Sequence, residues 1–214
     1  MMERSIKIYL FGFIVGLVVC FILLLSYPSL YYAFLAILMK KTEMQTDALG
    51  GSQTLSIGLN NVVASLLAAY GGYILSKIFF LLNNNSHYAM PGLLGMLDAK
   101  SRAVPRERLK YYLALYTFPT FALFINGFVL GAFLMLYAEN LEAYLANLLP
   151  HGFLEVPGIL LSGGIGLTIA DGSVFGDGDL KENLEEIARR QVPRYLIVME
   201  LLIISAFLEV LPAA

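Results

Sequence analysis

The sequence has few charged residues and a single cysteine, and it lacks several common catalytic and nucleotide-binding motifs. Only 14% of its 214 residues are charged and 58% are hydrophobic, which is too apolar for a soluble domain of this size. Cys20 is the only cysteine, so the chain cannot form an internal disulfide. It also lacks a Gly-x-Ser-x-Gly nucleophile elbow, a Walker loop and a dinucleotide fingerprint. These absences argue against serine hydrolase and nucleotide-binding mechanisms, and no cofactor is predicted.

Long apolar runs indicate an integral membrane protein. A helix needs about 20 apolar residues to cross about 30 Å of hydrocarbon. We therefore predict an all-α fold, a polytopic transmembrane helix bundle that forms one domain over residues 1–214. Five runs have the required length, and the predicted spans lie near residues 8–26, 56–82, 111–137, 152–170 and 195–212.

Basic residues near the span ends predict the orientation of the chain. Most Lys and Arg residues lie in the loops at 83–110 and 171–194, and Arg4 and Lys7 precede the first span. Cytoplasmic segments next to spans are enriched in Lys and Arg. We therefore predict a multi-pass protein of the cell membrane with both loops and the N-terminus in the cytoplasm. Five spans then place the C-terminus outside.

Two further helices are predicted at the membrane surfaces. Tyr31 to Met39 is apolar and aromatic but too short to cross, so we predict an outer interfacial or re-entrant helix. Residues 180–191 predict a cytoplasmic helix that Asp177 or Asp179 caps at its N-terminus. We expect this second helix to lie on the membrane surface or on the basic loop.

Small residues recur at every fourth position of most spans. Gly12 and Gly16 lie in the first span, and Gly127 and Gly131 lie in the third. In lipid, small residues mark the faces where helix backbones approach closely. The stripes predict a compact bundle. They also suit pairing between copies, so we predict a homo-oligomer, with a dimer favoured.

The most informative polar residues at membrane depth are His151 and Glu155. They are four residues apart and share one face of a helix, which Pro150 is predicted to begin in its first turn. A charge in lipid costs about 2.5–3.5 kcal/mol on insertion scales, so such a pair is a functional hypothesis by default. We predict no metal site, and the pair is only a weak candidate for one, because two protein ligands are too few for a catalytic zinc, which usually has three.

Three asparagines extend this polar group. Asn60 and Asn61 begin the second span, and Asn126 lies inside the third. Given the predicted orientation, these amides and the His–Glu pair are expected to share an outward-facing pocket. Hydrogen bonds between helices that only stabilise the bundle explain the same residues about equally well. Glu200 is a further acid inside a span. A proton-carrying role is one interpretation, and we favour the prediction that it bonds to a neighbouring helix.

These motifs resemble the stage II sporulation protein M family of membrane proteins. The resemblance covers about residues 8–166, and the chain departs from the family in its longer basic loop at 83–110. The family implies about five spans in this order and a membrane component of a complex that remodels cell wall. The motifs that carry it are Asn60-Asn61, Asn126-Gly127 with Gly131, and Pro150-His151-Gly152 with Glu155 and Pro157.

The sequence supports three function classes. The first is a non-enzymatic membrane scaffold or complex component, in contact with the lipid bilayer and a membrane or cell-envelope protein, and not with nucleic acid. The second is a transporter or channel for a small solute or ion that uses the polar residues. The third is an intramembrane metalloenzyme. We favour the scaffold because of the family resemblance and because no catalytic constellation is complete.

Overall fold

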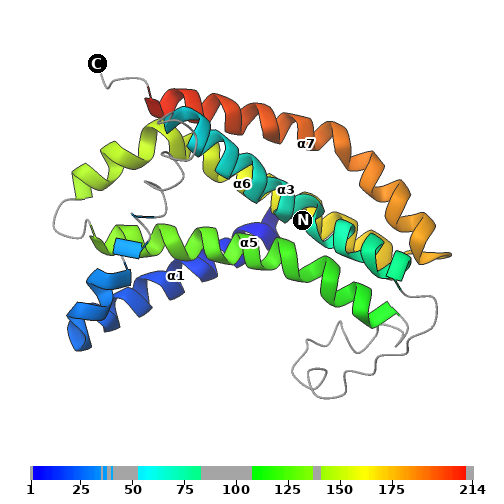
Figure 1. Cartoon of the computed structure of the whole chain (residues 1–214), viewed down its shortest axis with the longest axis horizontal. Coiled ribbons are helices and arrows are strands. Elements are labelled where there is room, and N and C mark those ends of the chain that lie inside the picture. The colour runs from blue at the N-terminus through cyan, green and yellow to red at the C-terminus, as the bar shows by residue number, and fades with distance from the viewer. Residues whose placement is uncertain are drawn as a thin grey trace.

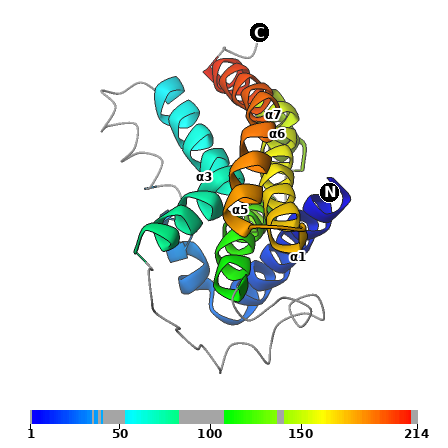
Figure 2. The same cartoon turned by 90° about the vertical axis from the view of Figure 1, so that its right-hand side faces the viewer.

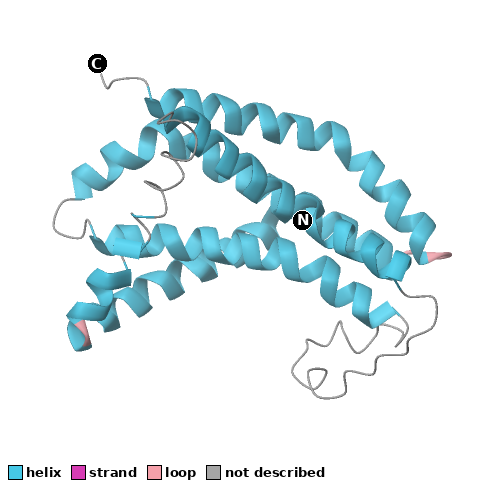
Figure 3. Ribbon diagram, in the orientation of Figure 1, coloured by secondary structure: helices cyan, strands magenta, loops and turns pink. Residues whose placement is uncertain are grey.

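The computed structural model describes residues 2–34, 36–37, 40, 53–82, 108–136 and 141–210, and nearly all of these residues are in helices (Figures 1 and 3). Five of the helices are long and apolar enough to cross a membrane. The predicted all-α bundle with five spans is therefore confirmed. The long helices are α1 (Met2–Ser26), α3 (Gln53–Leu82), α5 (Leu109–Leu136), α6 (Leu141–Phe175) and α7 (Leu180–Val210).

Helix α6 is the centre of the bundle, because it packs against each of the other four long helices. Figures 1 and 2 show α1 beside α5 on one side and α7 beside α6 on the other. Helix α3 contacts α5, α6 and α7. The core between these helices contains Leu123, Leu167 and Leu202, none of which is exposed.

The glycines of α1 and α5 face each other. Each has a backbone carbonyl of the other helix where its own Cβ would lie, so the two backbones are in direct contact. The predicted small-residue faces are thus used for packing within the bundle, as is usual for helices in lipid. The contacts pair Gly12 with Phe124, Gly16 with Phe128, Gly127 with Tyr9 and Gly131 with Phe13.

Helix α6 is longer than predicted. It begins at Leu141, so Pro150 lies well inside the helix and the prediction that Pro150 occupies its first turn is wrong. Figure 1 shows the first part of α6 at an angle to the rest. Prolines are the usual cause of such bends, and membrane helices tolerate them. Pro150 and Pro157 lie in this part of α6 and account for the bend.

Helix α7 replaces two predicted elements. The predicted surface helix at 180–191 and the last span form one continuous helix that passes through Pro193. Its first part packs on protein rather than on the membrane surface, because Leu184 is fully buried and Glu185 forms an ion pair with Lys77 of α3. The predicted cap is confirmed at Asp179, whose Oδ2 accepts hydrogen bonds from the Lys181 and Glu182 amides at 3.0 and 3.1 Å.

The segment after α1 is helical at 28–34 and folds back beside α1 (Figure 1). Tyr31 is buried there and packs with Cys20 of α1 and Ala132 of α5. This agrees with a helix in the predicted segment from Tyr31 to Met39, although Leu35, Leu38 and Met39 lie outside the described residues. Its depth relative to the membrane stays a prediction.

Candidate functional site

The predicted polar residues lie on three helices. Asn60 and Asn61 are in α3, and the Asn60 Nδ2 donates to the Asn61 Oδ1 at 3.5 Å. Asn61 is buried, and its own Nδ2 has no partner among the described residues. Asn126 of α5 donates to the carbonyl of Ala122, one turn earlier in its own helix, at 2.8 Å. The hydrogen bond of Asn126 is therefore local.

Glu155 and position 151 lie one turn apart on α6, which is helical throughout this region. The Glu155 side chain is half-buried, whereas the His151 side chain lies outside the described residues. Next to them, Gly152 is buried and Pro157 is exposed. A shared pocket with the three asparagines stays a prediction, as does the metal interpretation of the His–Glu pair.

A second polar group, missed in the sequence, lies at the opposite end of the bundle from α6 residues 152–155. The Tyr116 hydroxyl of α5 donates to the Asp171 Oδ1 of α6, and the Arg4 Nη1 of α1 lies 3.5 Å from the same oxygen. The Arg4 guanidinium also stacks over the Tyr116 ring, 4.9 Å from its centroid. One carboxylate thus joins three helices.

Further contacts at this end join the start of α5 to the end of α6. Arg108 donates to the carbonyls of Val174, Gly176 and Gly178 at 3.1, 3.1 and 2.7 Å. Carbonyls at a helix C-terminus have no partner within the helix, so Arg108 satisfies groups that α6 leaves open. Gly178 has a φ of 90°, which favours glycine in the turn to α7.

We call these contacts the polar end layer, which consists of Arg4, Lys77, Arg108, Tyr116, Asp171 and Glu185. It includes residues from or next to all five long helices. Arg4 pairs with Asp171 and Lys77 pairs with Glu185, whereas Arg108 donates to backbone carbonyls, so the layer holds the helix ends together. One sequence signal pointed to it: Asp171 is the first acid after the long apolar run of the fourth span.

The sequence as a whole matches one known family. The family model described as Stage II sporulation protein M matches residues 8–211. The chain belongs to the stage II sporulation protein M family. The match includes every predicted motif residue and all the long helices except the first residues of α1. No curated protein and no solved structure matches the chain.

In this stage II sporulation protein M family member, Glu200 is on the outside of the bundle. The prediction that it bonds to a neighbouring helix is wrong, because its side chain is exposed on α7. The inward face of α7 uses other residues, such as the buried Val198 and Leu202. Glu200 thus belongs to an outward apolar surface, the α7 outer face, which also includes Leu196, Ile203, Ile204 and Phe207.

In this family member, aromatic residues also join α3 to α7. The Ser65 and Tyr195 hydroxyl oxygens are 3.1 Å apart, and the Tyr70 hydroxyl donates to the Ala188 carbonyl at 3.4 Å. The Tyr70 and Tyr195 rings pack edge to face, with centroids 5.3 Å apart.

Among the described residues, no three His, Cys, Asp or Glu side chains are grouped to hold a metal ion.

Proposed function

We propose that this protein is a non-enzymatic scaffold in a cell-membrane complex and that it assembles as a homodimer through the α7 outer face. The observation that carries the proposal is Glu200, an acid on an otherwise apolar, exposed face of a membrane-spanning helix. The complex is expected to include a membrane or cell-envelope protein, in line with the role that the family name implies.

The cost of exposing a carboxylate to lipid favours a partner at Glu200. A charged side chain inside the bilayer costs about 2.5–3.5 kcal/mol on insertion scales. A two-fold symmetric contact brings each residue of a face close to the same face of the other copy. The Glu200 carboxyl groups of the two copies, in their neutral form, can then hydrogen-bond to each other. Such hydrogen bonds between helices stabilise helix pairs in membranes.

The glycine faces are not available for this contact, because Gly12, Gly16, Gly127 and Gly131 are already buried between α1 and α5. The α7 outer face is therefore the better candidate. Its apolar residues Leu196, Ile203 and Phe207 pack as well against lipid as against a second copy of the protein. The specificity of the dimer contact therefore depends on Glu200. The scaffold role further agrees with a polar end layer in which both carboxylates are engaged in ion pairs, Asp171 with Arg4 and Glu185 with Lys77.

Replacing Glu200 tests the proposal. Glu200→Leu is expected to weaken dimerisation in lipid vesicles about fivefold, because a hydrogen bond between membrane helices contributes about 1 kcal/mol. Energy transfer between labelled copies, measured while the protein is diluted into lipid, reports the dissociation constant. Glu142→Leu is the matched control, because it removes an exposed acid from α6 and is expected to leave dimerisation unchanged.

Two results would contradict the proposed dimer. A wild-type protein that stays monomeric at every dilution, or a Glu200→Leu variant that pairs as tightly as the wild type, would exclude the α7 contact.

The scaffold role is tested separately, by measuring the flux of ions and small solutes into vesicles containing the protein. Flux above that of empty vesicles would favour the transporter alternative over the scaffold.

We also propose the orientation with the N-terminus in the cytoplasm and the C-terminus outside. It is supported by the basic loops and by the position of Arg4 and Arg108 at the same end of the bundle. A Val104→Cys variant in a Cys20→Ala background is expected to resist an impermeant thiol reagent in intact cells and to react after lysis. Labelling of intact cells would show the opposite orientation.

A further inference from the structure

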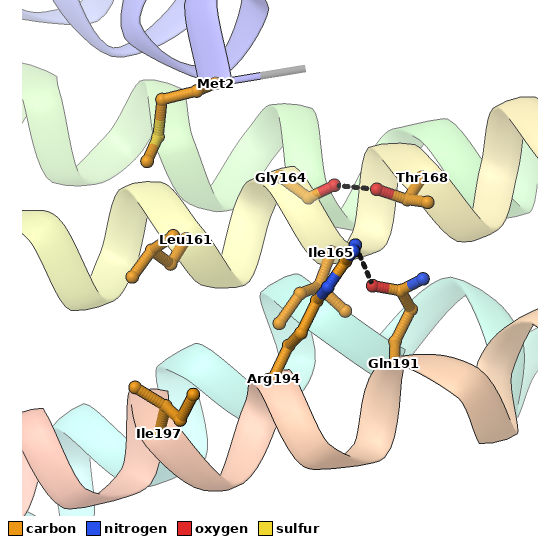
Figure 4. Close-up of a pocket in the computed structure, with 8 residues that line it drawn as sticks. All are labelled: Met2, Leu161, Gly164, Ile165, Thr168, Gln191, Arg194 and Ile197. Carbon is orange, nitrogen blue, oxygen red and sulfur yellow. Dashed lines mark hydrogen bonds between the residues drawn. The ribbon is translucent and has the colours of Figure 1, made fainter.

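We propose that a groove between α6 and α7 binds an anionic phospholipid from the leaflet nearest the polar end layer. The groove has a volume of about 220 Å³ and is bounded by Met2 of α1 as well as by both helices. Figure 4 shows Leu161, Gly164 and Thr168 on the α6 side and Gln191, Arg194 and Ile197 on the α7 side.

The groove lies where two otherwise close helices leave space. Towards one end of the pair, a Cβ on Gly158 would meet the Leu202 side chain at 2.8 Å, and towards the other end a Cβ on Gly172 would meet Ile187 at 2.6 Å. A Cβ on Gly164, between these two contacts, would meet only the Ser5 Oγ, at 3.4 Å. The missing side chain at Gly164 therefore helps to keep the groove open.

The lining changes from polar to apolar along the helices. Gln191 and Thr168 lie towards the polar end layer, whereas Leu161 and Ile197 lie towards the opposite membrane surface. Both helices place their polar residues at the same end, because they are antiparallel neighbours joined by a short turn. A phospholipid has the same order, with its headgroup at the interface and its chains towards the bilayer centre.

Arg194 lies at the level where a headgroup is expected. Helix α7 has 31 residues and is about 46 Å long at about 1.5 Å per residue, which exceeds the hydrocarbon thickness of about 30 Å. The charged residues of α7 are concentrated before Tyr195, and apolar residues dominate after it. The hydrocarbon boundary therefore falls close to Arg194.

The charge of Arg194 is available to an anion. The Arg194 Nη1 donates to the Gln191 Oε1 at 3.1 Å, and no carboxylate lies within ion-pair distance of Arg194 in the described part of the chain. Arg190, one turn earlier, pairs with Glu186. Figure 4 shows the Arg194 side chain extending from α7 towards α6, with the Gln191 amide beside it. A lipid phosphate complements this guanidinium.

The lining of the groove matches an amphipathic lipid better than a free phosphate. Arg194 alone would hold a free phosphate, and the rest of the groove would be unused. Acyl chains cover Leu161, Ile165 and Ile197, which are apolar and line the same cavity. Basic pockets between membrane helices commonly bind anionic headgroups in this way.

Lipid titration tests the proposal. The purified full-length protein is titrated with phosphatidylglycerol or phosphatidylcholine, and bound lipid is counted by native mass spectrometry while the thermal midpoint is measured. Wild-type protein is expected to prefer phosphatidylglycerol. Arg194→Gln is expected to weaken phosphatidylglycerol binding about fivefold and to remove the preference, since one basic residue contributes about 1 kcal/mol to such binding. Arg190→Gln is the matched control and is expected to bind like wild type.

Two more variants separate the headgroup from the chains. Arg194→Lys keeps the charge and is expected to keep the preference, so the test holds even if Arg194→Gln folds poorly. Gly164→Leu fills the groove and is expected to weaken both lipids. Equal binding of the two lipids by wild type, or unchanged binding by Arg194→Gln, would overturn the proposal. Equal stabilisation by glycerol phosphate, which has no acyl chains, would show that the site takes a soluble anion instead.

Discussion

Gly127→Ala is expected to lower the free energy of unfolding by about 1–3 kcal/mol, the usual cost of forcing extra volume into a packed interior. Its new Cβ would overlap the Tyr9 carbonyl oxygen and would lie 3.0 Å from the Phe13 backbone nitrogen. Both are backbone atoms, so no side chain can rotate away and α1 must shift as a whole. Unfolding in mixed micelles of increasing denaturing detergent measures the change.

Gly164→Ala is the matched control for this prediction, because it adds the same methyl group to a glycine with space around it. It is expected to change the free energy of unfolding by less than about 0.5 kcal/mol. The α1–α5 backbone contact is contradicted if the two variants unfold at the same detergent fraction. Gly127→Leu gives an extreme case and is expected to abolish the folded protein.

Asp171→Ala is expected to lower the free energy of unfolding by about 1–2 kcal/mol. The substitution removes the acceptor of the buried Tyr116 hydroxyl and leaves the Arg4 guanidinium without its ion pair. Breaking a fully buried ion pair costs about 3–5 kcal/mol. The cost here is lower because about a third of each charged side chain, 36% for Arg4 and 33% for Asp171, is in contact with solvent.

Glu186→Ala is the control for Asp171, since it removes an acid that pairs with Arg190 on the exposed face of α7. It is expected to cost less than about 1 kcal/mol. A double-mutant cycle between Asp171→Ala and Tyr116→Phe should give a coupling of about 0.5–3 kcal/mol. Strictly additive effects of the two substitutions would show that the hydroxyl and the carboxylate do not interact.

The spans and several contacts could be predicted from the sequence because their causes are local. Hydrophobic length alone determines whether a helix crosses the bilayer, and all five predicted spans match long helices. Glycines spaced by four mark close contacts wherever they occur, which Gly12 and Gly127 confirm. Asp179 caps α7 through amides two and three residues away.

The features that could not be predicted from the sequence depend on contacts between residues far apart in the chain. Arg4 pairs with Asp171 only because the start of α1 and the end of α6 lie at the same level, and no sequence window contains both residues. Helix α7 continues through Pro193 because Leu184 and Tyr195 are buried on either side of it. The exposure of Glu200 likewise depends on which face of α7 meets α6 and α3, which hydropathy does not report.

The backbone contact between α1 and α5 also has a consequence for how the protein is made. Helix α1 finds its largest contact surface on α5, which ends about 110 residues after α1 does. At about 5–20 residues per second, the ribosome completes α5 roughly 5–20 s after α1 has emerged. During that interval α3 enters the bilayer first, although it has little contact with α1 in the folded protein. The nascent α1 therefore stays in the bilayer without its main packing partner until α5 has been synthesised, which happens after α3.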